Sequence, residues 1–510
     1  MVSTRTGAGH LPRWLLSGAL LFLASLAGPC APASARIPEE VDKFVHDCME
    51  RYKAPGVAIA VIDHDDSLIG GFGTRTYGKD APVNADTLFM IASNTKPFTA
   101  ALLGTLVDQK LIGWDDHVVD RLPEFALKDP YPTRMCTPRD LLAHRSGLPP
   151  FGGNNLEALG FSRAEILRRM KYIEPHCSFR DKAGYSNPGF FAAGMLAARV
   201  AQTDYEDLMR KSLFAPLKMT DSGLSHHDRE GRDNVADAHK LLPDGTSVVV
   251  PWDDHDPMAP AGAITSTARD MANWVRMWLD NGRFDGKQVL SPETVEEMLT
   301  PSMVETPTFA EMAPIDKDSG FSYGLGWGIY YYKGHKIIEK GGARTGMRSI
   351  VVLVPDKKIG IVVLANQNLT VVPEAIRAYL LEEMVAPSGR DLQKDISDAN
   401  DHVVKTFTRR EAPARPAAPM SVPVGNYAGK YSNDLYGEVE VIVDEQNRLW
   451  WQAGPAKVRG PLAPLGHDVF LLSWPGERIS LPEEATFVLS SEGKPVSLIT
   501  ESFGELKRVD

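Results

Sequence analysis

Residues 89–100 read FMIASNTKPFTA, and this stretch decides the fold and the chemistry that we expect for the chain. The apolar run ends in a small residue and delivers Ser93 to the start of a predicted helix, and Lys96 follows one turn later on the same face. A serine hydroxyl becomes a nucleophile when a neighbouring base removes its proton, and a lysine with a lowered pKa is such a base. The S-x-x-K pattern therefore indicates a nucleophile and its base, although by itself it also describes an ordinary helix N-cap.

Three further stretches favour the chemical interpretation. Residues 184–189, GYSNPG, place a Y-S-N triplet in a turn rich in Gly and Pro, and residues 340–343, KGGA, follow a strand-like apolar pair. A longer segment, TPRDLLAHRSGLP, spans residues 137–149. At these residues the chain resembles the serine β-lactamase and penicillin-recognising enzyme family, in particular its class C branch, which carries S-x-x-K, Y-x-N and K-T-G in this order. The resemblance covers roughly residues 40 to 385, and the longer segment is its most specific part.

The order of strands and helices agrees with this resemblance. Residues 57–62 and 68–72 predict a hairpin near the N-terminus, and strands return at 323–330, 349–354 and 359–365 after a mostly helical middle segment. The resemblance implies an α/β (α+β) fold. Its antiparallel sheet, of the β-lactamase/transpeptidase type, would be built from both ends of the chain, flanked by helices and placed beside an all-helical subdomain.

We expect four parts along the chain. They are a signal peptide over residues 1–35, a serine hydrolase domain over 36–385, a proline-containing linker over 386–424 and a β-domain over 425–510. Short alternating strands separated by Gly/Pro turns predict that the last part is an antiparallel barrel or sandwich. It resembles the small lipocalin-like barrel appended to some serine hydrolases of this family, which implies a role in covering the cleft or in homo-oligomer assembly.

The N-terminal segment has the features of a secretory signal. Arg5 and Arg13 precede an apolar run over residues 14–28, and Ala33-Ser34-Ala35 forms an A-x-A cleavage site. The run is shorter than the roughly 20 residues that a membrane-spanning helix needs. We therefore predict a periplasmic or secreted protein.

Charge and composition exclude several partners. The chain of 510 residues has 43% apolar and 24% charged residues, as soluble globular proteins do, and its net charge is −11. An acidic chain without a Lys/Arg run does not suit nucleic acid or an anionic membrane surface. Cys48, Cys136 and Cys177 are too few for a disulfide framework, although one bridge would be possible outside the cytoplasm.

The motifs predict acyl transfer through Ser93. Lys96, made neutral by burial and neighbouring cations, is one candidate for the base that accepts the serine proton. Tyr185 is the other, because Lys96 and Lys340 on either side would favour its phenolate. The sequence leaves both open.

The substrate-binding residues surround this group. We expect Asn187 to bond the lysine and a substrate amide, and Lys340 to direct positive potential toward a substrate carboxylate. The Gly342-Ala343 backbone completes the site, and the N–H groups of Ser93 and Ala343 form the oxyanion hole.

The third motif departs from the family pattern. Gly341 replaces the usual Thr or Ser and removes a hydroxyl that helps to bind a β-lactam or a peptide carboxylate. This favours a D-amino-acid peptidase or an esterase over a true β-lactamase or DD-carboxypeptidase. A non-catalytic protein that binds peptidoglycan peptides is the alternative from another class. Arg344 or Arg348 could meet an anionic substrate group, but for both we expect a solvated loop arginine.

Other enzyme classes lack their motifs. The chain has no G-x-S-x-G, which argues against an α/β-hydrolase. His226-His227-Asp228 and residues 253–256 lack the spacing of known zinc motifs. We therefore predict no metal site and no cofactor, and a small-molecule or peptide substrate as the partner.

Overall fold

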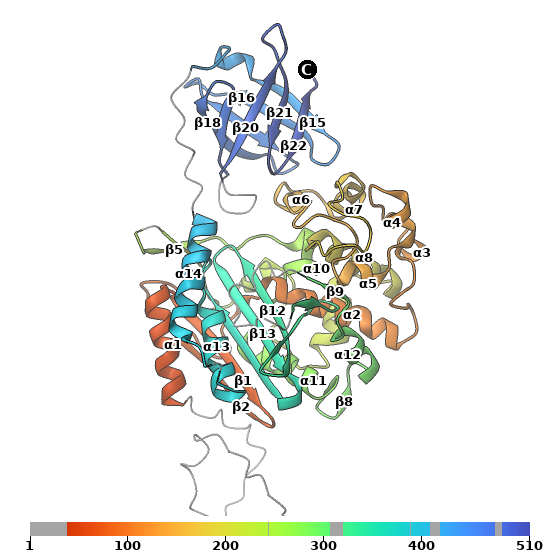
Figure 1. Cartoon of the computed structure of the whole chain (residues 1–510), viewed down its shortest axis with the longest axis vertical. Helices are drawn as coiled ribbons and strands as arrows, with labels where there is room; N and C mark the ends of the chain where they lie inside the picture. Colours follow the sequence, from red (N-terminus) through yellow and green to blue (C-terminus); the bar gives the residue numbers. More distant parts are fainter. Residues whose placement is uncertain (1–37, 243, 306–319, 388, 409–418, 475–481) are drawn as a thin grey trace, which may run out of the picture.

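The structure is a computed structural model that describes residues 38–242, 244–305, 320–387, 389–408, 419–474 and 482–510. Figure 1 shows a sheet covered by helices, a helical cluster beside it and a barrel at the C-terminal end. The predicted signal peptide lies outside the described residues. Among the described residues, no helix combines the length and the apolar character that crossing a membrane requires.

The central sheet is antiparallel throughout, in the order β2-β1-β14-β13-β12-β11-β10-β9. Its strands are β1 (Gly56–Asp63), β2 (Asp66–Gly73), β9 (Met303–Val304), β10 (Ser322–Tyr323), β11 (Gly328–Tyr332), β12 (His335–Arg344), β13 (Met347–Val354) and β14 (Ile359–Ala365). The pairing of β1 with β14 joins the two ends of the hydrolase segment. The prediction of one antiparallel sheet built from both ends is confirmed.

Both faces of the sheet are covered, because β14 and residues 350–354 of β13 form continuous apolar runs and both strands are fully buried. Alternate side chains enter two cores: Val351 joins the first and Ile350 the second. The first core includes α2 (Thr95–Asp108), α11 (Ala268–Leu279) and α12 (Pro292–Met298), and it continues into the helical subdomain. The second core includes α1 (Glu39–Tyr52), α13 (Val372–Met384) and α14 (Leu392–Thr408). α14 lies beside α13 and buries Ile396 there, while the boundary predicted at residue 385 stays a prediction.

The helical subdomain packs on α2, mainly through α8. Its helices are α3 (Val118–Arg121), α4 (Pro130–Met135), α5 (Pro138–Leu142), α6 (Asn155–Ala158), α7 (Arg163–Arg169), α8 (Asn187–Ala201), α9 (Tyr205–Met209) and α10 (Ala259–Gly262). Three two-stranded ribbons complete the hydrolase part: β3 (Phe89–Met90) with β6 (Thr265–Ser266), β4 (Ala238–Leu241) with β5 (Ser247–Val250), and β7 (Arg283–Phe284) with β8 (Lys287–Gln288).

The C-terminal part is a closed antiparallel barrel of eight strands, which resolves the expectation of a barrel or a sandwich. The strands are β15 (Gly429–Asn433), β16 (Gly437–Val443), β17 (Leu449–Ala453), β18 (Val458–Gly466), β19 (Val469–Leu472), β20 (Glu483–Leu489), β21 (Pro495–Thr500) and β22 (Gly504–Arg508). Aromatic rings fill the interior: Trp451 lies 5.7 Å from Trp474 and 4.9 Å from Phe503 between centroids. This barrel has a packed core, as small eight-stranded barrels do.

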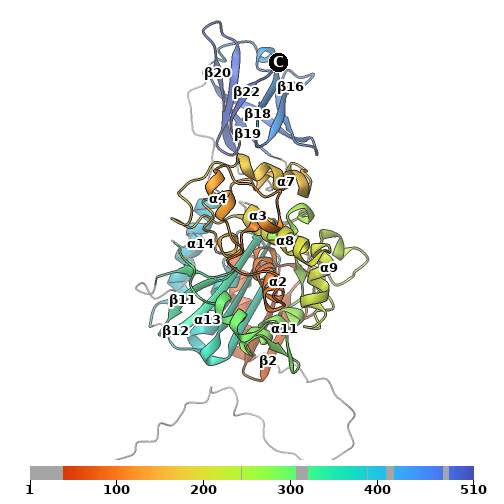
Figure 2. The same ribbon diagram turned by 90° about the vertical axis from the view of Figure 1, so that its right-hand side faces the viewer.

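The barrel rests on the helical subdomain, as Figure 2 shows from the side. Arg169 at the end of α7 donates to the carbonyl oxygens of Asp434 and Leu435 at 3.0 and 2.7 Å. The N–H of Ala456 donates to the carbonyl oxygen of Leu159 at 3.0 Å. The contacts therefore join the barrel to the segment around α6 and α7.

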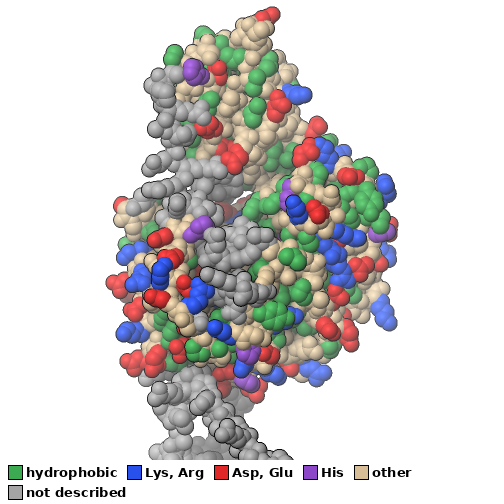
Figure 3. All heavy atoms as spheres, in the orientation of Figure 1, with side chains coloured by type: hydrophobic (Ala, Val, Ile, Leu, Met, Phe, Trp, Pro, Cys, Tyr) green, Lys and Arg blue, Asp and Glu red, His purple; other side chains and the backbone are tan. Residues whose placement is uncertain are grey.

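The distribution of charged side chains on the surface and the state of the cysteines can be compared with the sequence analysis. Figure 3 shows basic and acidic side chains interspersed over the described residues of this face. Cys48, Cys136 and Cys177 are free thiols, so the one disulfide that the sequence left open is not formed among them.

Candidate active site

Ser93 lies on a sharp turn at the beginning of α2. The turn is a 3-10 segment, Ala92–Asn94, that continues directly into the helix at Thr95. Ala92 has a φ of 49°, a left-handed conformation that is unusual for a residue with a side chain. The predicted helix start is thus a 3-10 turn, and Lys96 still follows one turn after the serine.

Strands β12 and β13 pack against this turn and fix its position. Ser349 Oγ donates to the carbonyl oxygen of Ile91 at 2.7 Å and accepts from Asn94 Nδ2 at 2.8 Å. A Cβ atom on Gly342 would lie 2.3 Å from that Ile91 oxygen. Gly342 is therefore required, because only a residue without a side chain lets β12 approach the turn this closely.

Gly341 has the opposite surroundings. A Cβ atom there would meet nothing within 4 Å, and the residue lies exposed on the cleft wall. Packing does not demand a glycine at this position. The missing hydroxyl therefore leaves open space beside the nucleophile.

The Lys96 side chain is fully buried and bonded on all sides. Its Nζ donates to Asn187 Oδ1 at 2.7 Å and to the carbonyl oxygen of Ala261 at 2.8 Å, and lies 3.1 Å from Ser93 Oγ. Asn187 is held in turn, because its Nδ2 donates to Asn154 Oδ1 at 3.1 Å. The structure thus brings Ser93, Lys96 and Asn187 together as predicted.

The surroundings of Lys96 favour its neutral form. Burial lowers the pKa of this amine well below that of an ordinary lysine, and the positive charges of Lys340 and Arg344 lower it further. A neutral amine has two N–H groups and one lone pair. Two acceptors, Asn187 Oδ1 and the Ala261 carbonyl, match the two N–H groups, so the lone pair is left for Ser93 Oγ.

Tyr185 approaches the nucleophile from the other side. Its hydroxyl donates to Ser93 Oγ at 2.8 Å, and its ring centroid lies 4.8 Å from Lys96 Nζ and 4.7 Å from Lys340 Nζ. Burial raises the pKa of the phenol, and the hydrogen bond to Ser93 offsets only part of that rise. This direction is opposite to the expected phenolate, because burial disfavours the charged form of the phenol.

Lys340 is buried at the opposite wall, where its Nζ donates to the hydroxyl of Tyr323 at 2.8 Å. Burial lowers the pKa of Lys340 to about 8, and the nearby Glu305 carboxylate partly counteracts this. Tyr323, on β10, is both buried and part of the cleft wall. No sequence pattern indicated Glu305.

His144 supports Tyr185. Its Nδ1 accepts from the N–H of Ser186 at 3.0 Å, and its ring centroid lies 4.5 Å from that of Tyr185 and 4.7 Å from that of Tyr323. Burial, followed by the charge of Lys340, lowers the pKa of His144 well below its ordinary value. The long segment at residues 137–149 thus supplies a neutral imidazole that packs behind the phenol.

A cleft of about 340 Å³ opens over this group. Ser93, Gly341, Gly342 and Ala343 lie on its lining, so the two backbone N–H groups predicted for the oxyanion hole belong to the same cleft. A Cβ atom on Gly342 would lie 3.2 Å from the Ser93 nitrogen, which places β12 directly beside the nucleophile.

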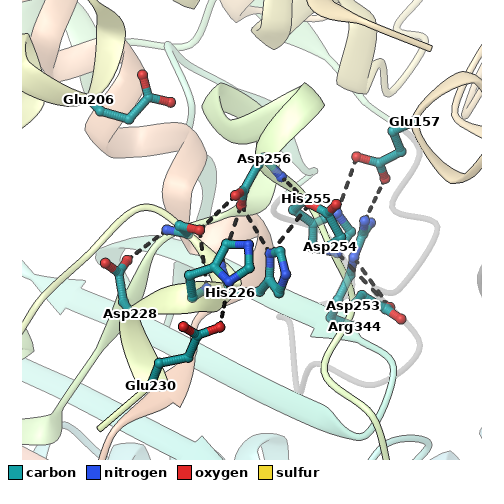
Figure 4. A network of polar contacts seen from close by, with 12 residues as sticks. Glu157, Glu206, His226, Asp228, Glu230, Asp253, Asp254, His255, Asp256 and Arg344 are labelled. Atoms are coloured by element: carbon teal, nitrogen blue, oxygen red, sulfur yellow. Dashed lines mark hydrogen bonds and ion pairs between the residues drawn. The ribbon is translucent and has the colours of Figure 1, made fainter. Parts of the chain in front are cut away.

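The far end of the cleft is closed by an ion pair. Arg344 donates to Glu157 Oε1 at 2.5 Å, and Glu157 Oε2 lies 3.1 Å from His255 Nδ1 (Figure 4). Glu157 and His255 are both buried. The prediction of a solvated Arg344 is therefore wrong, because this side chain is paired with a buried carboxylate. The same prediction for Arg348 is wrong as well, because this side chain is buried and pairs with Glu374.

Several known proteins are similar to this chain in sequence or in structure. A protein of Aspergillus campestris named unguisins hydrolase ungD' is 27% identical over 489 residues, which cover 90% of this chain and 88% of that protein. Beta-lactamase-like protein 2 of Dictyostelium discoideum is 28% identical over 71% of this chain and 66% of its own length. Among solved structures, the octameric penicillin-binding protein homologue from Pyrococcus abyssi matches with a TM-score of 0.60 and 22% identity, over 92% of this chain and 99% of its own.

Two family models match the chain. The model described as a domain of unknown function, DUF3471, matches residues 410–508, which include the barrel. The model described as Beta-lactamase matches residues 41–386, the segment that carries the sheet, the helical subdomain and Ser93. The chain therefore belongs to the β-lactamase family.

Proposed function

We propose that the protein is a serine hydrolase that cleaves amide or ester bonds through an acyl-enzyme on Ser93. One arrangement carries the proposal: Lys96 Nζ donates to Asn187 Oδ1 and to the Ala261 carbonyl and lies 3.1 Å from Ser93 Oγ, so in the neutral form that burial favours its lone pair faces the serine hydroxyl. Such an amine is a general base within reach of the proton that it removes.

In the first step Lys96 takes the Ser93 proton while Oγ attacks the substrate carbonyl carbon. The carbonyl π electrons move to oxygen, and the backbone N–H groups of Ser93 and Ala343 stabilise the resulting oxyanion. The left-handed turn at Ala92 and the close approach of β12 at Gly342 hold these groups rigidly. This fixed geometry needs little reorganisation during the reaction.

In the second step the carbonyl re-forms and the leaving group departs. Tyr185 lies 2.8 Å from the same Oγ and carries a proton, so it donates that proton to the departing nitrogen or oxygen. The proton held by Lys96 then restores the phenol. Water enters, Lys96 acts as base again, and the ester to Ser93 is hydrolysed by the reverse sequence of proton transfers.

The substrate we propose is an amide or ester of the peptidase or esterase type. The open space at Gly341 supports this over a β-lactam or a DD-carboxypeptidase substrate, because no hydroxyl is present there to meet a carboxylate. The names of two similar proteins also support it: unguisins hydrolase and a D-stereospecific amidohydrolase from Streptomyces sp., the latter with a TM-score of 0.54 and 21% identity.

Localisation and assembly belong to the same proposal. The sequence of residues 1–35 supports export to the periplasm or the medium, which N-terminal sequencing of the mature protein tests. The octameric relative supports homo-oligomer formation, which sedimentation equilibrium measures directly.

A fluorophosphonate probe tests the central claim. It should label the wild type once, at the peptide that contains Ser93, and it should not label Ser93→Ala. A fluorescent penicillin measured beside it separates a true β-lactamase or DD-peptidase, which it labels rapidly, from the hydrolase proposed. If neither reagent labels the folded protein, the non-catalytic binding protein replaces this proposal.

A further inference from the structure

Two histidines and two aspartates meet beside the cleft, although they come from segments far apart in the sequence. His226 and His227 begin a 3-10 turn, and Asp254 and Asp256 belong to the loop that leads to α10 (Figure 4). One ligand atom from each of His226, His227 and Asp256 lies within 4.8 Å of the others. We propose that this cluster binds a divalent transition metal ion of the zinc class.

The spacing around His226 suits such an ion. Its Nδ1 lies 3.4 Å from Asp254 Oδ1 and 3.4 Å from Asp256 Oδ1. Two ligand atoms bound to one tetrahedral zinc ion at its usual bond lengths are about 3.3 Å apart. Small side-chain rotations on a surface turn are therefore enough to bring these atoms onto one ion.

Two of the ligands are already oriented by other side chains. His227 Nδ1 bonds Glu230 Oε1 at 2.6 Å, which leaves its Nε2 for a metal. Asp256 Oδ2 accepts from Ser225 Oγ at 2.6 Å, while its Oδ1 faces the His226 imidazole and accepts a long bond of 3.4 Å from the His226 N–H. Metal-binding histidines and carboxylates in proteins are held by outer partners in this way, and such partners fix the ligand atom that faces the ion.

The carboxylates of the cluster face the imidazoles, while the nearby Arg163 guanidinium pairs with Glu206 and bonds only the carbonyl oxygen of Asp256. In the part of the chain that the structure describes, the ion pairs of Asp254, Asp256 and Glu230 are with the two imidazoles and with no lysine or arginine. The imidazole nitrogens favour zinc, nickel or cobalt over magnesium and calcium, which prefer oxygen ligands. The mixed nitrogen and oxygen set therefore selects the class of ion.

The metal site that we propose lies next to residues that line the end of the cleft. Asp254 and Asp256 flank His255, which bonds Glu157, and Glu157 holds Arg344 at the end of the cleft. An ion at the cluster fixes the loop that carries His255. Neither segment alone has the spacing of a metal motif, so only the fold creates the site.

Isothermal titration calorimetry of the tag-free, full-length protein with zinc chloride tests the proposal. We expect one equivalent to bind, with at least 10-fold weaker binding to the His226→Ala/His227→Ala double variant and to Asp256→Asn. His64→Ala is the matched control, because His64 is an exposed histidine that bonds a carboxylate, Asp63, at 2.8 Å. It should bind zinc as the wild type does.

Thermal unfolding provides a second readout that separates binding from folding damage. Zinc should raise the Tm of the wild type and of His64→Ala, since a ligand that binds only the folded state stabilises it, and it should not raise the Tm of the cluster variants. No saturable zinc binding by the wild type, or equal binding by the folded double variant, overturns the proposal. Tighter binding of magnesium than of zinc overturns the assigned class of ion.

Discussion

Tyr185 and Ser93 share a 2.8 Å hydrogen bond in which the phenol is the donor. A hydroxyl that donates to the nucleophile cannot at the same time remove its proton. This donor direction supports the division of roles that we propose, in which Lys96 accepts the serine proton and Tyr185 supplies one to the leaving group.

The two roles predict the kinetics of single and double variants. Lys96→Ala and Tyr185→Phe should each lower kcat/KM for a p-nitrophenyl ester by roughly 100-fold or more, the scale of general acid and base catalysis. The double variant should be little worse than either single variant, because both residues act in one proton network through Ser93 Oγ. Losses that multiply in the double variant would show that the residues act independently.

The pH dependence should differ between neutral and anionic substrates. Burial lowers the pKa of Lys340 to about 8, so the side chain is positively charged below that pH and loses its charge above it. The value of kcat/KM for an ester with a free carboxylate should fall as pH rises through about 8, while that for a neutral ester should keep its level. In Lys340→Ala the two esters should show the same profile above neutral pH. A fall of equal size for both esters in the wild type would contradict this role of Lys340.

The lysine base predicts the acidic limb of the same profiles. Lys96 is active when neutral, so the rate should fall as pH decreases through its pKa, which burial places well below that of an ordinary lysine. Both esters share this limb, because it reports the base and not the substrate charge. The measurement is kcat/KM across pH for each ester, with Tyr185→Phe as the variant that should retain the limb.

Two adjacent glycines provide a matched test of the cleft. Gly341→Thr should fold normally, because its Cβ meets nothing within 4 Å, and should raise the acylation rate by a carboxylate-bearing β-lactam about 10-fold through one added hydrogen bond. Gly342→Ala should lose most activity, because its Cβ would lie 2.3 Å from the Ile91 oxygen and push β12 away from Ser93. Stopped-flow acylation and thermal unfolding of both variants check the contrast, and an active, stable Gly342→Ala would refute the packing argument.

Local motifs predicted most of the fold and the centre of the site. Short sequence motifs contain Ser93, Lys96 and Tyr185. The chemistry and the backbone geometry of each motif depend on residues that are neighbours in the sequence, so these three residues could be predicted from the sequence. The Ala261 carbonyl that accepts from Lys96 has no signature, because every residue has a carbonyl and only packing selects this one. The pair of Glu157 and Arg344 likewise joins segments 187 positions apart, which one sequence does not relate.

The buried Asp140 carboxylate should stabilise the segment of residues 137–149, which carries His144. Its carboxylate is fully buried, accepts from Thr137 at the N-cap of α5, and binds Arg145 Nε at 2.7 Å and Arg180 NH2 at 2.8 Å. Asp140→Asn keeps the shape but removes the charge that both guanidiniums face. We expect a loss of about 3 kcal/mol in unfolding free energy, at the lower end for a broken buried pair because both arginines reach solvent.

Asp270 is the matched control for this prediction. It occupies the same position after a threonine N-cap, in α11, and it is also buried. Among the described residues, the Oδ2 atom of its carboxylate accepts only from the Asp221 N–H and the Ser222 hydroxyl. Asp270→Asn keeps an amide oxygen that accepts, so it should cost about 1 kcal/mol, the difference between hydrogen bonds to a charged and to a neutral acceptor. Urea unfolding of both variants measures the difference. Equal losses would mean that capping, and not the two arginines, stabilises the segment that carries His144.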